Sequence, residues 1–340
     1  MNAAMLTPPL GLLAWLGLAA WLAAGLHDIA TLAELAVAFI AVVVVPLLLP
    51  MTVSVAVPSD RSPRTSTNVP GDMSPGTEAT VPRWLAAGHA LGALGVLLGA
   101  AALPTGGAAS LALAGLWLGF TGLAALHALA RLRRRGLRQL PELAIDLGLL
   151  FLPGAGLWLL VYRGELVLGG FGGLAAVLTA GHFHAAGFGV LVMTGLLGRG
   201  LAEAGMPRAR KLYTFVAPAL MLAFPLLAAG IASASRPLEL AGAVLYAFAL
   251  PLLAGLQLGV AARLRGRPLA PRLLLAASAL AVLVATGFAL RFATQGFYGA
   301  AVELSTMLRY HALVNAVGFL GLGLLAWSLL RPRAGYVAGS

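Results

Sequence analysis

Long runs of apolar residues recur along the chain, and short segments rich in charge, proline and glycine separate them. Several runs reach the roughly 20 residues that an α-helix needs to cross about 30 Å of hydrocarbon. They lack the two-residue alternation of an outer-membrane barrel, so the spanning elements are expected to be helices. The pattern predicts an all-α, polytopic transmembrane helical bundle with ten helices, at about 8–25, 30–50, 84–103, 108–130, 141–162, 170–197, 212–233, 238–262, 271–292 and 304–330.

The polar segments between these runs suggest a domain organisation. Residues 51–83 are rich in Pro, Ser and Thr and are predicted to form a disordered cytoplasmic loop. This loop separates two N-terminal transmembrane helices (1–50) from an eight-helix core (84–333), and a short tail (334–340) follows. In an alternative model one helix is split or absent, most plausibly at the glycine-rich stretch GELVLGGFGGLAAV. A division of the ten helices into two five-helix halves is a further alternative. If the two halves were an inverted repeat, this would indicate a transporter.

The composition supports a membrane location. Hydrophobic residues make up 60% of the chain and charged residues 10%, whereas soluble domains have about 25% charged residues. The net charge is +11, and most of the 22 Lys and Arg residues follow the second, fourth, sixth, eighth and tenth predicted helices. Cytoplasmic loops are enriched in basic residues, so both termini are predicted to be cytoplasmic and the protein to lie in the inner (cytoplasmic) membrane. The basic charge therefore indicates topology and a lipid bilayer partner, not nucleic acid.

The residue types also exclude several kinds of chemistry. The chain contains no cysteine, which excludes disulfides, Cys-ligated zinc and iron–sulfur clusters. Any metal ion would need nitrogen or oxygen ligands. The sequence shows no nucleotide-binding loop, Ser-His-Asp arrangement or soluble catalytic domain. A classical enzyme is therefore not expected, and no catalytic residue is predicted.

Two histidines interrupt the apolar run of the sixth predicted helix, LTAGHFHAAGFGV, at His182 and His184. His182 lies about 18 and 22 Å from the two ends of that helix, near the membrane midplane. Helical residues two apart are turned by about 200°, so the imidazoles point to opposite sides and cannot chelate one ion together. Each imidazole is therefore expected to contact a different neighbouring group. His184 lies on a flat face of small residues, where a planar group or another helix could approach.

The tenth predicted helix contains a second polar pattern. Glu303, Met307, His311 and Asn315 recur at four-residue spacing and form one stripe. His311 and Asn315 lie about 10 and 16 Å below the outer boundary, so this helix and the sixth could share a site if they are neighbours.

Ionisable groups within a membrane are costly, and their default interpretation is functional. The candidate cofactor-binding or metal-ligating residues are therefore His182, His184 and His311, with Asn315 and Glu303 as supporting polar groups. In the alternative interpretation each imidazole bonds to an adjacent helix and only fixes packing, with Asn315 as the partner of His311.

The remaining polar residues in the predicted helices are weaker candidates. His89 and His127 lie near the cytoplasmic ends of their helices, where histidines can extend to the interface or bond locally. Glu34 and Asp146 each lie one turn inside a helix, so interfacial placement explains both without any chemistry.

Two motifs resemble a known family. LTAGHFHAAGFGV and RYHALVNAVGF, with WLLVYR as a weaker match, resemble the YndJ-like family of bacterial multi-pass membrane proteins. The resemblance covers most of the chain from about Trp84 onward. It implies a membrane architecture and supplies no biochemical activity.

A shorter resemblance suggests a cofactor. GHFH is similar to the His-Phe-His element of heme-copper oxidase catalytic subunits, in which the two histidines ligate two different hemes. That family's copper site needs three further histidines, two of them adjacent, but this chain has six histidines in all and no adjacent pair. An oxygen reductase is therefore not expected. The resemblance leaves a reduced form in which one heme lies between His311 and either His182 or His184.

The sequence supports three functional hypotheses. In the first, the midplane histidines of a YndJ-like membrane protein bind heme or a divalent metal ion. In the second, the protein is a proton-coupled secondary transporter whose histidines relay protons or bind substrate. In the third, it has a structural or assembly role. The ligand and the oligomeric state are left open.

Overall fold

The computed structural model describes residues 8–23, 28–53, 81–294 and 302–330. The loop predicted to be disordered lies mostly outside these ranges. The described chain is helical, apart from turns and one isolated bridge between Leu168 and Phe171. Its elements, with π-helical segments labelled η, are α1 (Pro8–Trp21), α2 (Ile29–Phe39), η2 (Ile40–Val44), α3 (Val45–Thr52), α4 (Arg83–Ala102), α5 (Ala108–Arg135), α6 (Leu140–Arg163), α7 (Gly173–His182), η3 (Phe183–Gly189), α8 (Val190–Glu203), α9 (Pro207–Ala232), α10 (Arg236–Arg263), α11 (Leu269–Ala293), α13 (Leu304–Met307), η4 (Leu308–Gly321) and α14 (Leu322–Leu330).

The described residues form nine continuous helices that are long and apolar enough to cross a membrane. They confirm the predicted all-α polytopic bundle. The first of the ten expected helices is present as α1, but its 14 residues extend only about 21 Å. The alternative that splits the sixth helix is wrong, because Gly173–Glu203 is continuous. The crowded glycines instead form the turn before that helix, and Gly169 and Gly170 adopt positive φ there.

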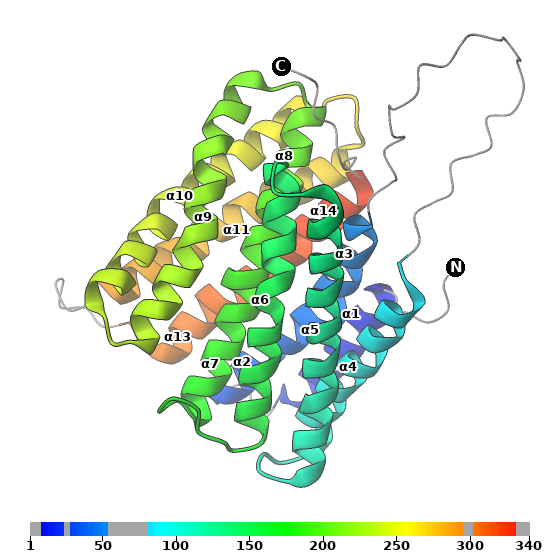
Figure 1. Ribbon diagram of the computed structural model, residues 1–340, viewed down its shortest axis with the longest axis vertical. Coiled ribbons are helices and arrows are strands. Elements are labelled where there is room, and N and C mark those ends of the chain that lie inside the picture. The colour runs from blue at the N-terminus through cyan, green and yellow to red at the C-terminus, as the bar shows by residue number, and fades with distance from the viewer. Residues whose placement is uncertain (1–7, 24–27, 54–80, 295–301, 331–340) are drawn as a thin grey trace, which may run out of the picture.

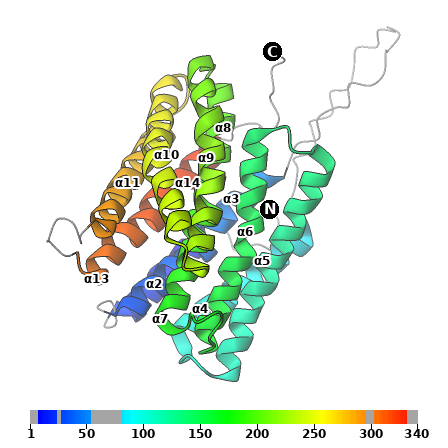
Figure 2. The ribbon, with the colours of Figure 1, turned by 60° about the vertical axis from the view of Figure 1, so that its left-hand side comes forward.

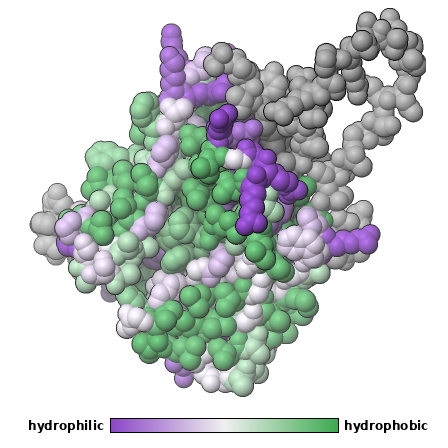
Figure 3. All heavy atoms as spheres, viewed as in Figure 1, coloured by the Kyte–Doolittle hydropathy of each residue, from purple (hydrophilic) through white to green (hydrophobic). Residues whose placement is uncertain are grey.

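The span from Ile29 to Thr52 lies at the centre of the bundle, and 94% of its most apolar window is buried. It contacts α1, α4, α7, η4 and α14. In two views, α9, α10 and α11 lie on one side of the molecule and α4, α5 and α6 on the other (Figures 1 and 2). Apolar residues cover much of the visible surface, whereas hydrophilic residues gather toward the upper part of the view (Figure 3).

The central span begins with a capped helix. The side chain of Asp28 accepts a hydrogen bond of 2.9 Å from the backbone N–H of Thr31. This N-cap satisfies a donor that the first helical turn leaves free. The same hydrogen bond lowers the pKa of the Asp28 carboxyl below its ordinary value.

Three spans that pack together each contain a π-helical segment, namely η2, η3 and η4. A carbonyl in each segment accepts a hydrogen bond from a side chain of a neighbouring helix. The donors are His89 to Ala41 (2.9 Å), Tyr246 to Ala186 (3.1 Å) and Ser278 to Phe319 (2.7 Å). Such bonds satisfy backbone groups that regular helical bonding does not, and π segments occur frequently at functional sites.

Glycines allow α6 to approach η3 and α8 closely. A Cβ atom at Gly148 would lie 2.9 Å from the carbonyl oxygen of Phe188, and one at Gly195 would overlap the carbonyl oxygen of Pro141. Small residues at helix contacts are typical of membrane bundles, in which packing rather than the hydrophobic effect drives association. This contact fixes the helix that carries His182 and His184 against α6.

Candidate functional site

His184 is completely buried, and both of its ring nitrogens are hydrogen-bonded. Its Nδ1 lies 2.8 Å from the carbonyl oxygen of Ala180, and its Nε2 accepts a hydrogen bond of 3.0 Å from the indole of Trp117 on α5. The two rings are also stacked, with centroids 5.8 Å apart. A carbonyl oxygen can only accept a hydrogen bond, so Nδ1 carries the hydrogen; an indole N–H can only donate, so Nε2 carries none and the ring is neutral. His184 therefore has no free nitrogen to offer a ligand.

The planar group that faces His184 is thus a tryptophan. Trp117 also contacts Phe120, with ring centroids 5.0 Å apart, and Phe120 contacts His89 at 5.2 Å. His89 is fully buried, and its Nε2 bonds to the carbonyl oxygen of Ala41. Of the two alternatives for His89, extension to the interface or a local hydrogen bond, the structure shows the bond, because the central span passes beside α4 and supplies a carbonyl partner in the interior.

His182 faces the other way, as helical geometry predicts, and its side chain is exposed. Its ring lies 6.4 Å from the ring of His311 on η4, with 33° between the two planes. The Nδ1 atom of His182 bonds to the carbonyl oxygen of Leu178 at 2.8 Å, and that of His311 bonds to Ala285 on α11 at 2.9 Å. Within the described chain, no residue hydrogen-bonds to Nε2 of either ring. The structure therefore brings His182 and His311 together and leaves an acceptor nitrogen on each.

Of the other polar residues in the predicted stripe, Asn315 lies beside His311 and Glu303 does not. The Asn315 amide lies 3.5 Å from Nδ1 of His311, next to the pair. Glu303 is the N-cap residue of α13, and its carboxylate contacts Ser305 at 3.5 Å. Glu303 makes no contact with His311 among the described residues, because the eight residues between them correspond to about 12 Å along a helix.

The structure does not support heme or metal binding at His182, His184 and His311. No group of three or more His, Cys, Asp or Glu side chains that could hold a metal ion occurs among the described residues. His182 and His311 are only two ligands, and His184 is hydrogen-bonded to Trp117. The similarity of GHFH to the oxidase element therefore does not extend to heme ligation.

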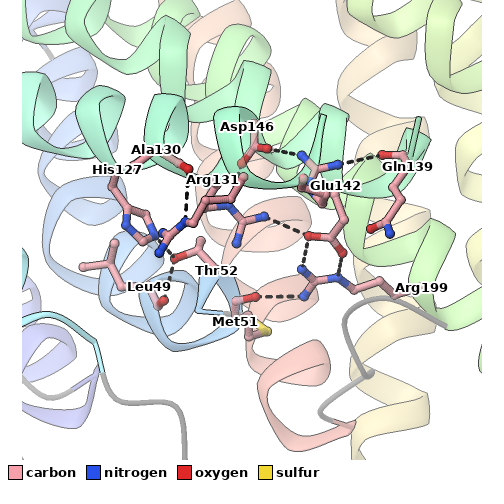
Figure 4. Close-up of polar contacts among 12 residues, drawn as sticks. Leu49, Met51, Thr52, His127, Ala130, Arg131, Gln139, Glu142, Asp146 and Arg199 are labelled. Atoms are coloured by element: carbon pink, nitrogen blue, oxygen red, sulfur yellow. Dashed lines mark hydrogen bonds and ion pairs between the residues drawn. The ribbon is translucent and has the colours of Figure 1, made fainter. Parts of the chain in front are cut away.

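A buried network of charges lies at the end of the bundle where α5 ends and α6 begins (Figure 4). Glu142 accepts hydrogen bonds from Arg131 (2.8 Å) and from Arg199 (2.6 and 2.7 Å). Asp146 accepts one from Arg131 (2.6 Å) and forms an ion pair with Arg135. Glu142, Asp146, Arg131 and Arg199 are each no more than 5% exposed. These bonds join α5, α6 and α8.

The central span is attached to the same network. Nη1 of Arg199 donates to the carbonyl oxygen of Met51 on α3 at 2.8 Å. Next to it, Thr52 bonds to Nε2 of His127 at 3.3 Å. The network therefore links four helical segments at one end of the bundle, which we predict to face the cytoplasm.

Asp146 and Glu34 lie near the ends of their spans, as expected, but each forms an ion pair within the bundle. The sequence contained a signal for the ion pairs of Asp146. Arg131 and Arg135 are four residues apart, and so are Glu142 and Asp146. Residues at this spacing share a helix face, and a short turn joins the two helices. The two charged faces were therefore positioned to meet.

Glu34 lies in a second buried pair at the opposite end of the bundle. Arg163 donates to Glu34 at 2.9 Å, to the hydroxyl of Ser110 at 2.9 Å, and to the carbonyl oxygens of Gly99 and Leu103. A cavity of about 20 Å³ lies beside these groups, enough for one water molecule. Arginines from neighbouring helices therefore bond to the central span near both of its ends, Arg163 to Glu34 and Arg199 to the carbonyl of Met51.

A family model described as YndJ-like protein matches residues 35–319 of the chain. The chain belongs to the YndJ-like family. The matched range contains both histidine motifs and nearly all of the two charge networks. This confirms the family to which the motifs pointed.

One similar protein is the "Uncharacterized membrane protein YndJ" of Bacillus subtilis (strain 168), which is 28% identical over 215 residues. The match covers 63% of this chain and 38% of the relative, so the chain spans less than half of the relative's length. No solved structure matches the chain. The name of this relative agrees with a membrane protein and states no biochemical activity.

Proposed function

We propose that this protein is a proton-coupled secondary transporter in which His182 and His311 together form the proton- or solute-binding site. The main observation behind this proposal is that the two imidazole rings lie side by side on different membrane spans, with their centroids 6.4 Å apart. Each ring is fixed through Nδ1 to a backbone carbonyl. The two Nε2 atoms are therefore left to accept a proton, or an N–H or O–H group of a solute.

The depth of the pair supports this assignment. His182 is nine residues from the start of its span at Gly173, which corresponds to about 14 Å along the helix. An ionisable side chain at such depth is costly unless it is used or paired. His184 is hydrogen-bonded within the packed interior, whereas His182 is exposed and bonds only to its own helix.

Two further features favour transport over a purely structural role. Three spans that pack against one another each contain a π segment, and such segments occur frequently at functional sites. Ion pairs also join helices at both ends of the central span, at Glu142 and at Glu34. Contacts of this kind can open one end while the other stays closed, as alternating access requires.

Proton movement into liposomes tests the proposal across several classes of solute at once. The full chain is reconstituted into vesicles loaded with a pH-sensitive dye, and a panel of amino acids, sugars and monovalent cations is added outside. We expect at least one solute to cause proton uptake above that of empty vesicles. His182→Ala and His311→Ala should each abolish this uptake, whereas His127→Gln, outside the pair, should retain it.

Two results would contradict the proposal. The first is that no solute of the panel moves protons through the wild-type protein. The second is that uptake survives in both histidine variants. Either result, with a correctly folded protein, favours the structural or assembly role.

A further inference from the structure

A groove of about 350 Å³ lies at the end of α10 and is separate from the histidine pair. Its lining residues come from the last turn of α10, the loop after it and the turn between α8 and α9, and they are Met206, Gly259, Ala262, Arg263 and Arg265. The absence of a side chain at Gly259 keeps the groove open, since a Cβ atom there would lie 3.2 Å from the terminal methyl of Met206.

The groove carries two cationic side chains that have no anionic partner among the described residues. Arg263 and Arg265 are exposed, and neither forms an ion pair in the described part of the chain. The neighbouring arginines are engaged elsewhere, because Arg267 pairs with Glu203 and Arg272 donates to the carbonyl oxygen of Ala261. The groove therefore presents two free guanidinium groups beside an apolar floor.

An apolar track continues from the groove along α10 toward the middle of the bilayer. Gly255 lies one turn before Gly259, and a Cβ atom there would meet no neighbour within 4 Å. Leu252 and Phe248 follow on the same face and are 44% and 71% exposed. This track borders the hydrocarbon and gives an acyl chain a surface to pack against.

We infer that the groove binds an anionic phospholipid. The phosphate would lie between Arg263 and Arg265, and an acyl chain would follow the α10 track. Arginine binds phosphate with paired, charge-assisted hydrogen bonds, and basic pockets of membrane proteins bind anionic lipid headgroups at this boundary. The bilayer itself supplies the ligand, so the site needs no soluble partner and does not depend on the proposed transport.

Native mass spectrometry of the detergent-purified full chain tests the site. Phosphatidylglycerol or phosphatidylcholine is titrated in, and the bound fraction of each is measured. One arginine at an anionic lipid surface is worth a factor of about five in affinity, so the Arg263→Ala/Arg265→Ala variant should bind phosphatidylglycerol about 30-fold more weakly. The control variant Arg133→Ala/Arg134→Ala removes two exposed arginines at the end of α5 and should bind normally.

A second variant distinguishes the contribution of the groove's shape to lipid binding from that of the arginine charges. Gly259→Leu keeps both arginines but fills the space beside Met206, and we expect it to weaken phosphatidylglycerol binding as well. The inference is overturned if the wild type binds the two lipids equally, or if the arginine variant and its control lose affinity to the same extent. Thermal unfolding of each variant verifies that the protein is folded.

Discussion

The two histidines of the HFH motif have different surroundings, so their replacement should have different consequences. His184→Ala removes the acceptor of the Trp117 indole N–H in a fully buried site. His182→Ala removes an exposed ring whose only hydrogen bond is to its own helix. The second variant is a matched control, since residue type, motif and span are the same.

The expected magnitude for His184→Ala has two parts. A buried N–H left without its partner costs about 1–3 kcal/mol. Loss of the stacked ring contact with Trp117 adds about 0.5–1.5 kcal/mol. His184→Ala should therefore lower the free energy of unfolding by about 1.5–4.5 kcal/mol, whereas His182→Ala should change it by about 0.5 kcal/mol or less.

Unfolding by sodium dodecyl sulfate in mixed micelles measures these free energies. A double-mutant cycle with Trp117→Phe isolates the hydrogen bond and should give a coupling energy of about 1 kcal/mol. The reasoning fails if the two alanine variants are equally destabilised. It also fails if the effects of His184→Ala and Trp117→Phe are additive.

Three further predictions concern other parts of the structure. Glu142→Gln leaves two buried arginines without full charge compensation and should cost about 3–5 kcal/mol in the same unfolding assay, whereas Glu239→Gln, in an exposed pair, should cost less than about 1 kcal/mol. Asp28→Ala removes an N-cap and should cost about 1 kcal/mol at pH 7. Because the folded protein lowers the pKa of Asp28, this difference should shrink as the pH falls below about 4, which a pH series of unfolding measurements checks. Gly195→Ala introduces a methyl group against the backbone of Pro141 and should lower the melting temperature, whereas Gly119→Ala, which has open space around it, should not.

The sequence predicted the architecture well because the membrane restricts it. Apolar runs of the required length predict helices, and the ends of these helices agree with the structure to within six residues. The opposite orientation of His182 and His184 was also predictable, since it depends only on helical geometry. Identification of the motifs led to the correct family.

The partners of these residues were not predictable, because they depend on which helices are neighbours. Trp117 is 67 residues before His184, and the sequence gives no sign that α5 packs against η3. Nothing in the composition of Phe183–Gly189 or Leu308–Gly321 distinguishes a π segment from an α-helix. For the same reason the sequence could not show that the planar group beside His184 is Trp117, a side chain of the protein itself, and the structure does not support the heme or metal hypothesis.

The central claim is that His182 and His311 form one accessible site while His184 faces the interior. The chain has no cysteine, so introduced cysteines can be modified without background labelling. In membranes, His182→Cys should react with a water-soluble maleimide, and a short bifunctional thiol reagent should cross-link the His182→Cys/His311→Cys variant. His184→Cys should resist the maleimide, and paired with His311→Cys it should not cross-link. Equal labelling at positions 182 and 184, or cross-linking of 311 to 184 instead of 182, would contradict the account.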